Sequence, residues 1–131
     1  MPLNPALEGK AYSPISFEVA PDLVARFSSA VGEDGSFVPP TFVTVPEIVA
    51  LAQVIADPDL RLDFARVVHG GQEYEWRRPV RESDTLSVTA RIAEVRITRG
   101  FEFLTVETEM RDDSGELVVL ARNGLIVRNG A

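Results

Sequence analysis

Apolar residues recur at two different spacings along the chain, and the change in spacing divides it into a helical half and a strand half. After residue 65 apolar and polar residues alternate, and this period of two is typical of strands that bury one face. The runs 72–77, 86–92 and 104–110 alternate in this way, whereas 116–128 is more continuously apolar, which predicts a strand covered on both faces. Turn-forming residues separate the later runs and predict an antiparallel meander, at 81–84, 98–100 and 112–115.

Two helices are predicted before residue 60. Pro21 and Asp22 favour the first turn of one helix, and Gly32 is a suitable residue to end it. The second helix covers 46–56 and contains only Glu47 and Gln53 as polar residues after its proline. Because a helix that is apolar on nearly all sides is buried on most of them, we expect this helix to lie at the centre of the molecule.

The two halves together predict an α+β fold in a single domain, 1–131. Residues 1–20 are rich in proline and read as an extended arm, with a short strand near 15–19. A sheet with one apolar face needs a cover, and the helix at 46–56 is the only apolar element available to provide it. The expected architecture is a curled antiparallel sheet wrapped around one central apolar helix. Such a sheet leaves an edge strand open, so we expect the chain to pair with another protomer.

Composition excludes several classes of site. The chain has no cysteine, which excludes disulfides and thiolate catalysis, and its one histidine excludes a multi-histidine metal site. We therefore expect neither a metal nor a cofactor. The net charge is −7, from 20 acidic and 13 basic residues, so the chain has no electrostatic reason to bind nucleic acid. No apolar run approaches the roughly 18 residues of a membrane span, and no secretory signal is present, so we expect a cytoplasmic protein without membrane insertion.

His69 is the one side chain that titrates near neutral pH without help. It is either a strand-end histidine bonded to backbone or a polar group directed into a ligand channel. Gly70 and Gly71 follow it, and glycines within a strand often permit a bulge or a close backbone approach, which favours the second interpretation. No nucleophile motif accompanies it.

Three further polar residues, Glu47, Gln53 and Asn123, each have more than one interpretation. Thr44 and Glu47 have the spacing of a capping box, although Glu47 at a buried helix start could also be a general base. Gln53 could satisfy a buried backbone group, reach a dimer partner or contact a ligand. Asn123 interrupts the last apolar strand and has the same alternatives.

Several segments, taken together, resemble the N-terminal-type MaoC-like dehydratase domain, which has a hot-dog fold. The matching stretches, in the family's order, are "LEGKAYSPISFEVAPDLVARFSSAVGE" (7–33), "VPPTFVTV" (38–45), "VVHGGQEYEWRRPVRESDTLSV" (67–88) and "LIVRNG" (125–130). The family includes the A-type subunit of heterodimeric (3R)-hydroxyacyl-ACP dehydratases. The resemblance implies a hot-dog subunit of fatty-acid metabolism that acts on acyl-CoA or acyl-ACP as a dehydratase or hydratase.

The chain departs from the catalytic members of that family after the first predicted helix. Those relatives carry an Asp-x-Asn-Pro-x-His element there, in which His moves the α-proton and Asp handles the hydroxyl or water. Here the stretch 30–40 is shorter than usual and contains no histidine after Glu33 or Asp34. A-type subunits also lack the dyad, and their partner supplies it. We therefore expect a homodimer, or a heterodimer with a catalytic MaoC-like subunit, and little activity from this chain alone.

The resemblance assigns no catalytic residue, and His69 is the only candidate for one. From their positions in the sequence, we expect the substrate-binding residues of the acyl-thioester channel to be His69, Gly70, Gly71 and Gln53. Two alternatives remain open: a non-enzymatic acyl-thioester binding or assembly module, and a hot-dog acyl-CoA thioesterase in which Glu47 or another acid activates water.

Overall fold

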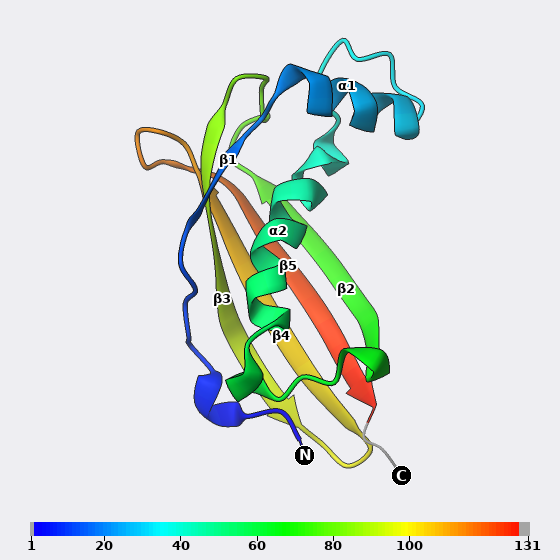
Figure 1. The fold of residues 1–131 in the computed structure, drawn as a ribbon, viewed down its shortest axis with the longest axis vertical. Helices are drawn as coiled ribbons and strands as arrows, with labels where there is room; N and C mark the ends of the chain where they lie inside the picture. Colours follow the sequence, from blue (N-terminus) through cyan, green and yellow to red (C-terminus); the bar gives the residue numbers. More distant parts are fainter. Residues whose placement is uncertain (1, 129–131) are drawn as a thin grey trace.

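A five-stranded antiparallel sheet curls around helix α2 in the computed structural model, which describes residues 2–128 (Figure 1). This arrangement confirms the predicted α+β hot-dog architecture. The helices are α1 (Pro21–Ala30) and α2 (Thr44–Ile55), and the strands are β1 (Ile15–Glu18), β2 (Val67–Trp76), β3 (Thr85–Ile97), β4 (Phe101–Arg111) and β5 (Leu117–Arg128).

The strand order is β1-β3-β4-β5-β2, so only part of the predicted meander is present. β3, β4 and β5 follow one another through hairpins at the expected turns, but β2 pairs antiparallel with β5 at the edge of the sheet. The meander prediction is therefore wrong for β2. Alternation shows which residues share a face and does not show which strands are neighbours.

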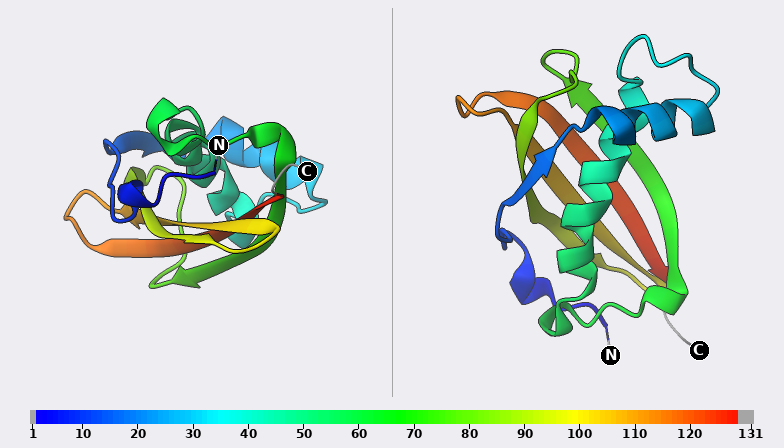
Figure 2. Two further views of the ribbon diagram at one scale, coloured as in Figure 1. Left: turned by 90° about the horizontal axis from the view of Figure 1, so that it is seen from below. Right: turned by 45° about the horizontal axis from the view of Figure 1, so that its top comes forward.

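Helix α2 packs along the inner face of the sheet and covers that face alone (Figure 2). Its sheet-facing residues Ala50, Leu51 and Val54 are buried, which confirms its central position. Its outer face is open, however, and Ile48 is 60% exposed. The expectation that this helix is buried on most sides is wrong for the chain alone, because the sheet covers only one side of it.

The expectation that the last strand is covered on both faces is wrong for the same reason, because the sheet is covered on one side only. In β5 the residues that face α2 are buried, whereas Leu120 and Ile126 on the other face are only partly buried. The described helices lie on one face of the sheet, so β5 is flanked by strands on both edges but is not covered on both faces (Figure 2).

The predicted arm and first helix are both present. The arm follows β3, where Tyr12 N–H donates to Ala90 O at 2.9 Å, and it includes β1 within the expected range. α1 ends as predicted: Gly32 has φ of 82°, and Glu33 N–H donates to Ser28 O in a Schellman arrangement. The Phe27 ring packs edge-on against the Phe42 ring, with 5.5 Å between the ring centroids, and this contact holds α1 beside the start of α2.

Candidate functional site

A buried polar network joins α2 to β2 and β5. Glu47, which is 1% exposed, lies in the first turn of α2. The Tyr74 hydroxyl donates to its Oε1 at 2.6 Å, and Gln72 Nε2 donates to its Oε2 at 2.8 Å. Asn123 Nδ2 in turn donates to Gln72 Oε1 at 3.0 Å. Both carboxylate oxygens are thus satisfied by neutral donors, and no described cation lies within 4.0 Å of them.

The predicted capping box at Thr44 and Glu47 is wrong. A 3-10 turn, Pro40–Val43, runs directly into α2, so carbonyl groups of that turn accept the Thr44 N–H. The Thr44 hydroxyl donates to the Thr41 carbonyl instead of capping the helix. Since the backbone of the turn satisfies the start of α2, the Glu47 side chain is free to point toward the sheet.

Tyr74 keeps its proton throughout the ordinary pH range. Burial, followed by the hydrogen bond to the Glu47 carboxylate, raises the pKa of the Tyr74 hydroxyl well above its usual value. The hydroxyl therefore remains a donor to Glu47. Because Tyr74 and Glu47 are 27 positions apart, the sequence pattern alone did not reveal this pair; the only signal was that Gln72 and Tyr74 share one face of an alternating strand.

His69 lies on β2 beside Leu125 of β5, at the edge strand of the sheet, and its side chain is exposed. The strand register shifts between His69 and Gly71, so the bulge that the two glycines predicted is present. A Cβ atom at Gly70 would lie 2.8 Å from Ile126 Cδ1, whereas a Cβ at Gly71 would meet nothing within 4 Å. A side chain at position 70 would therefore require Ile126 to move, whereas one at position 71 would not.

Of the four residues predicted to line an acyl channel, His69, Gly70 and Gly71 are consecutive on β2, and Gln53 lies on α2. Gln53 is partly buried on α2, and its Oε1 is buried without a hydrogen-bond partner among the described residues. No hydrogen bond connects it to His69 within residues 2–128. Gly71 lines a cavity of about 150 Å³ with Gln72, Glu73, Thr105, Arg122 and Gly124. This cavity is smaller than the roughly 300 Å³ at which ligand pockets begin.

The loop after α1 carries no acid–base pair. Asp34 is exposed, and its Oδ1 accepts the Ser36 N–H at 2.9 Å. The hydrogen bonds from Ser36 lower the pKa of Asp34 below its usual value, so this carboxyl is ionised at neutral pH. An ionised, exposed carboxylate without an imidazole beside it is a poor proton donor to a leaving hydroxyl.

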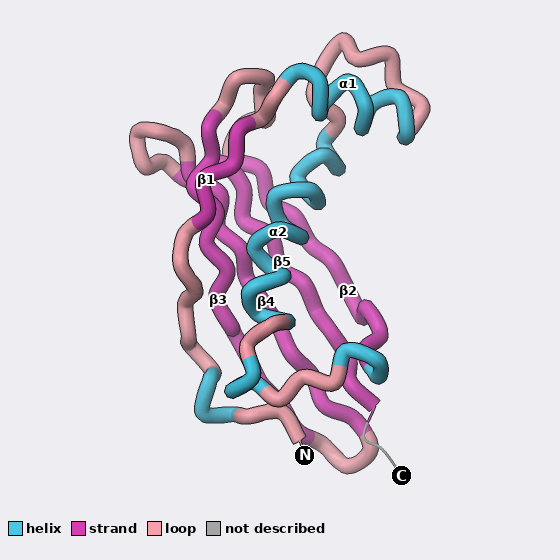
Figure 3. Tube along the Cα trace, viewed as in Figure 1, coloured by secondary structure: helices cyan, strands magenta, loops and turns pink. Residues whose placement is uncertain are grey.

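A larger hollow lies at the end of the sheet where α2 begins. Two adjoining cavities of about 620 and 460 Å³ share Val38, Pro40, Pro79 and Val80 in their walls. The loop after α1 forms one side, and the connection from β2 to β3 forms the other. Figure 3 shows both of these loops at the end of the sheet where α2 begins. Sequence reasoning missed this groove, because both of its walls are loops that apolar periodicity does not describe.

The described residues contain neither a metal cluster nor a membrane-spanning helix. No three or more histidine, aspartate or glutamate side chains between residues 2 and 128 are grouped to hold a metal ion. Within the same part of the chain, no helix is long and apolar enough to cross a membrane.

Comparison with known proteins places the chain among relatives of nearly the same length. Residues 6–121 match the family model described as FAS1-like, dehydratase domain region. A UPF0336 protein of Streptomyces coelicolor is 36% identical over 145 aligned positions, which cover 98% of this chain and 97% of that protein. Since the alignment is longer than the 131 residues here, the relative carries inserted residues that this chain lacks.

Solved structures share the fold. The C-terminally truncated HadBC complex of Mycobacterium tuberculosis, a (3R)-hydroxyacyl-ACP dehydratase, superposes with a TM-score of 0.79 at 22% identity, over 92% of this chain and 96% of that one. A MaoC-like dehydratase gives a TM-score of 0.82 at 17% identity, over 95% of this chain and 43% of the longer neighbour.

Proposed function

Because this chain belongs to the family of FAS1-like dehydratase regions, we propose that it is a hot-dog subunit that binds acyl thioesters for dehydration of (3R)-hydroxyacyl groups or hydration of 2-enoyl groups. A partner subunit supplies the Asp/His dyad. One observation carries this proposal: the loop that holds the dyad in catalytic relatives holds Glu33 and Asp34 here, without a histidine.

The position of the one imidazole supports this division of labour. Removing an α-proton and protonating a leaving hydroxyl requires two groups that face the same few substrate atoms. His69 lies on β2, and no hydrogen bond joins it to Asp34 in the described chain. The chain therefore offers an acyl-binding fold without a paired acid and base.

The surface beside β2 supports the need for a partner. β2 pairs with β5 on one side only, so its other edge presents unpaired backbone groups. Exposed apolar residues adjoin this edge or lie on the open face of α2: Ile48, Val49, Val68 and Trp76. Open backbone and exposed apolar side chains together favour a protomer that continues the sheet and covers the helix. The HadBC neighbour from Mycobacterium tuberculosis is itself a complex.

Glu47 supports a second candidate function, an acyl-CoA thioesterase. A buried carboxylate without a cation beside it is the kind of group that enzymes use to activate water. Its two oxygens already accept hydrogen bonds from Tyr74 and Gln72, however, so water would have to displace one of these donors. This arrangement favours the dehydratase-subunit proposal over the thioesterase.

Reconstitution tests the proposed function. The chain is purified alone and again with a hot-dog partner from the same source that carries the Asp/His element, and hydration of crotonyl-CoA and a longer 2-enoyl-CoA is measured. We expect turnover only when both proteins are present. A partner that is fully active without this chain, or release of free CoA by this chain alone, would replace the proposal with the binding module or the thioesterase, respectively.

A further inference from the structure

The hairpin that joins β3 to β4 ends in an ordered turn, which projects beyond the end of α2 (Figure 1). The Thr98 N–H and the Thr98 hydroxyl both donate to the Phe101 carbonyl, at 2.9 and 2.8 Å. Gly100 has φ of 93°, a conformation that glycine adopts at little cost. The turn therefore holds Arg99 in a defined position at the extreme end of the sheet.

Large apolar side chains beside this turn remain in contact with water. Ile97 is 44% exposed and Phe101 is 46% exposed. Phe103 and Ile126 lie opposite each other on β4 and β5, and both are only partly buried. Exposed apolar side chains that gather at one place on a surface mark an interaction site.

Three exposed arginines surround these apolar side chains. The Arg96 guanidinium lies 4.0 Å from the centre of the Phe103 ring, and Arg128 lies opposite Phe101 in the strand register. Neither Arg99 nor Arg128 forms an ion pair with any residue from 2 to 128. We name the whole surface the hairpin-tip patch; it comprises Arg96, Ile97, Arg99, Phe101, Phe103, Ile126 and Arg128.

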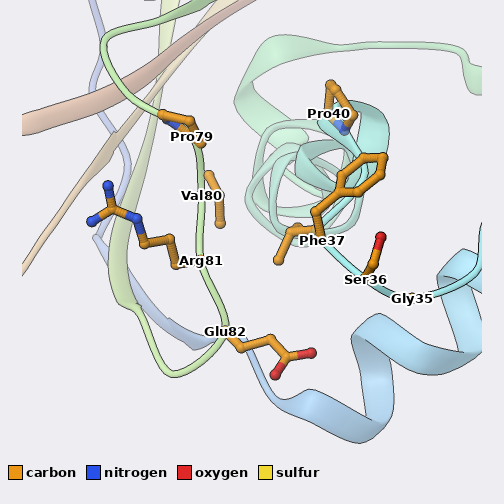
Figure 4. Close-up of a pocket in the computed structure, with 9 residues that line it drawn as sticks. Gly35, Ser36, Phe37, Pro40, Pro79, Val80, Arg81 and Glu82 are labelled. Carbon is orange, nitrogen blue, oxygen red and sulfur yellow. The ribbon is translucent and has the colours of Figure 1, made fainter.

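The two ends of the sheet differ in their balance of charge. At the groove end, Figure 4 shows the Glu82 carboxylate near the loop that carries Ser36, and Asp34 is exposed in the same loop. Within residues 2–128 neither acid is in an ion pair, so negative charge is in excess there. A chain with a net charge of −7 can approach an anionic surface favourably only with its arginine-rich end first.

We propose that the hairpin-tip patch docks on the surface of an anionic lipid bilayer. Ile97 and Phe101 enter the headgroup region, and the arginines lie against the lipid phosphates. An apolar centre ringed by cations matches the boundary between acyl chains and charged headgroups. A fluid lipid surface accommodates a projecting turn, whereas a folded acidic partner would need a hollow shaped to receive it.

This inference goes beyond the proposed acyl-thioester function and does not depend on it. Peripheral docking needs no membrane-spanning helix. β5 lies between β4 and the edge strand β2, so a chain docked through the hairpin leaves open the edge that the proposed partner would meet.

Co-sedimentation with lipid vesicles tests the proposal on the full chain. One set of vesicles is phosphatidylcholine alone, and in the other about a third of the lipid is phosphatidylglycerol. We expect binding to the anionic vesicles only, and we expect it to be lost when sodium chloride is raised from about 0.05 to 0.5 M, because salt screens the attraction. Binding to neither set, equal binding to both, or binding that salt does not weaken would overturn the proposal.

A charge reversal locates the contact. Arg99→Glu should lower the partition coefficient on anionic vesicles by roughly 10- to 30-fold, since each basic side chain near such a surface contributes to the attraction. Arg26→Glu changes the net charge by the same amount in an exposed side chain on α1, at the other end of the molecule, and should change binding by less than about twofold. Equal losses in the two variants would show that the hairpin is not the docking site.

Tryptophan emission tests whether the tip enters the headgroup region. The single tryptophan, Trp76, lies beside the groove at the other end of the sheet, so wild-type emission should stay unchanged when vesicles bind. Phe101→Trp should bind as wild type does, and its emission should shift to shorter wavelength with anionic vesicles. Co-sedimentation of this variant without an emission shift would contradict insertion at position 101.

A soluble acidic polypeptide distinguishes a lipid surface from an acidic protein. Polyglutamate is titrated into wild type and Arg99→Glu under the same low-salt conditions. If polyglutamate binds wild type more tightly than Arg99→Glu while anionic vesicles bind neither, the patch recognises an acidic protein and the lipid proposal fails. Vesicle binding that an excess of polyglutamate does not prevent supports the lipid surface.

Discussion

The Tyr74 hydroxyl on β2 donates a 2.6 Å hydrogen bond to Glu47 Oε1 on α2, and this contact fastens the edge strand of the sheet to the central helix. Gln72 supplies the second bond to the same carboxylate. Because the edge of β2 is the open edge that the proposed partner would meet, the Glu47 network holds that edge in place against α2.

Loss of the Tyr74 hydroxyl should be costly. Tyr74→Phe leaves Glu47 Oε1 buried without a donor, and we expect the free energy of unfolding to fall by about 1–3 kcal/mol in urea denaturation. Tyr12→Phe is a matched control, since Lys10 still binds Asp57 Oδ2 when the Tyr12 hydroxyl is removed. It should lose less than about 1 kcal/mol. Equal losses of unfolding free energy in the two variants would show that the Glu47 network stabilises the chain no more than the Tyr12–Asp57 hydrogen bond does.

The two adjacent glycines of β2 should respond differently to alanine. Gly70→Ala places a Cβ atom 2.8 Å from Ile126 Cδ1, so we expect a loss of about 1–3 kcal/mol in the free energy of unfolding. Gly71→Ala has open space and should change stability by less than about 1 kcal/mol. Adding Ile126→Val to Gly70→Ala should recover part of the loss. A Gly71→Ala variant as unstable as Gly70→Ala would contradict the close-packing account.

The contribution of Asp84 to the free energy of unfolding should decrease as the pH becomes acidic. Burial acts to raise the pKa of Asp84, but hydrogen bonds from Arg78 and from the Arg81 N–H outweigh burial and hold this pKa below its ordinary 3.8. The contribution is therefore complete above pH 3.8 and is lost as the pH falls through the lower folded-state value. Asp84→Asn should cost about 1–3 kcal/mol at neutral pH, and the gap to wild type should narrow in acid.

Asp22→Asn serves as the control for that experiment, because the Asp22–Arg26 pair is 3.9 Å apart and largely exposed. We expect it to change stability by less than about 0.5 kcal/mol at either pH. A gap for Asp84→Asn that stays constant from neutral pH to about pH 2 would rule out a lowered pKa as its cause.

Assembly should depend on the open face of α2. Ile48→Asp introduces a charge into the exposed apolar surface beside the edge strand, and we expect light scattering to shift toward the 14.4 kDa monomer. Ile97→Asp is the matched control, because Ile97 is also exposed but lies at the end of β3, next to the turn. If wild type is already a monomer at micromolar concentration, the expectation of pairing is wrong.

The residues that share a face could be predicted from the sequence, whereas the neighbours of each strand could not. Alternation placed Gln72, Tyr74 and Trp76 together, and all three lie on the face of β2 that adjoins α2. The pairing of β2 with β5 depends on contacts between residues about 50 positions apart, which no local pattern encodes. The sheet position of β2 therefore required the structure.

Glu47 shows why the candidate site was harder to predict than the fold. Glu47 lies three residues after Thr44, which is the spacing of a capping box. The turn Pro40–Val43 already supplies backbone acceptors at the start of α2, so no capping box forms there. The groove was missed for a related reason, because its walls come from two loops that meet only in the folded chain. By contrast, the bulge after His69 could be predicted, since glycines within a strand often mark a bulge or a close backbone approach.

The need for a dyad-bearing partner is tested by the hydration of crotonyl-CoA by the purified chain alone, measured for wild type and His69→Ala. We expect both proteins to be equally inert, at least roughly 10²–10⁴-fold below the same chain supplied with a dyad-bearing partner, since that is the usual contribution of a general acid–base group. Robust hydration by wild type without a partner would contradict it, and loss of that hydration in a folded His69→Ala variant would make His69 the base.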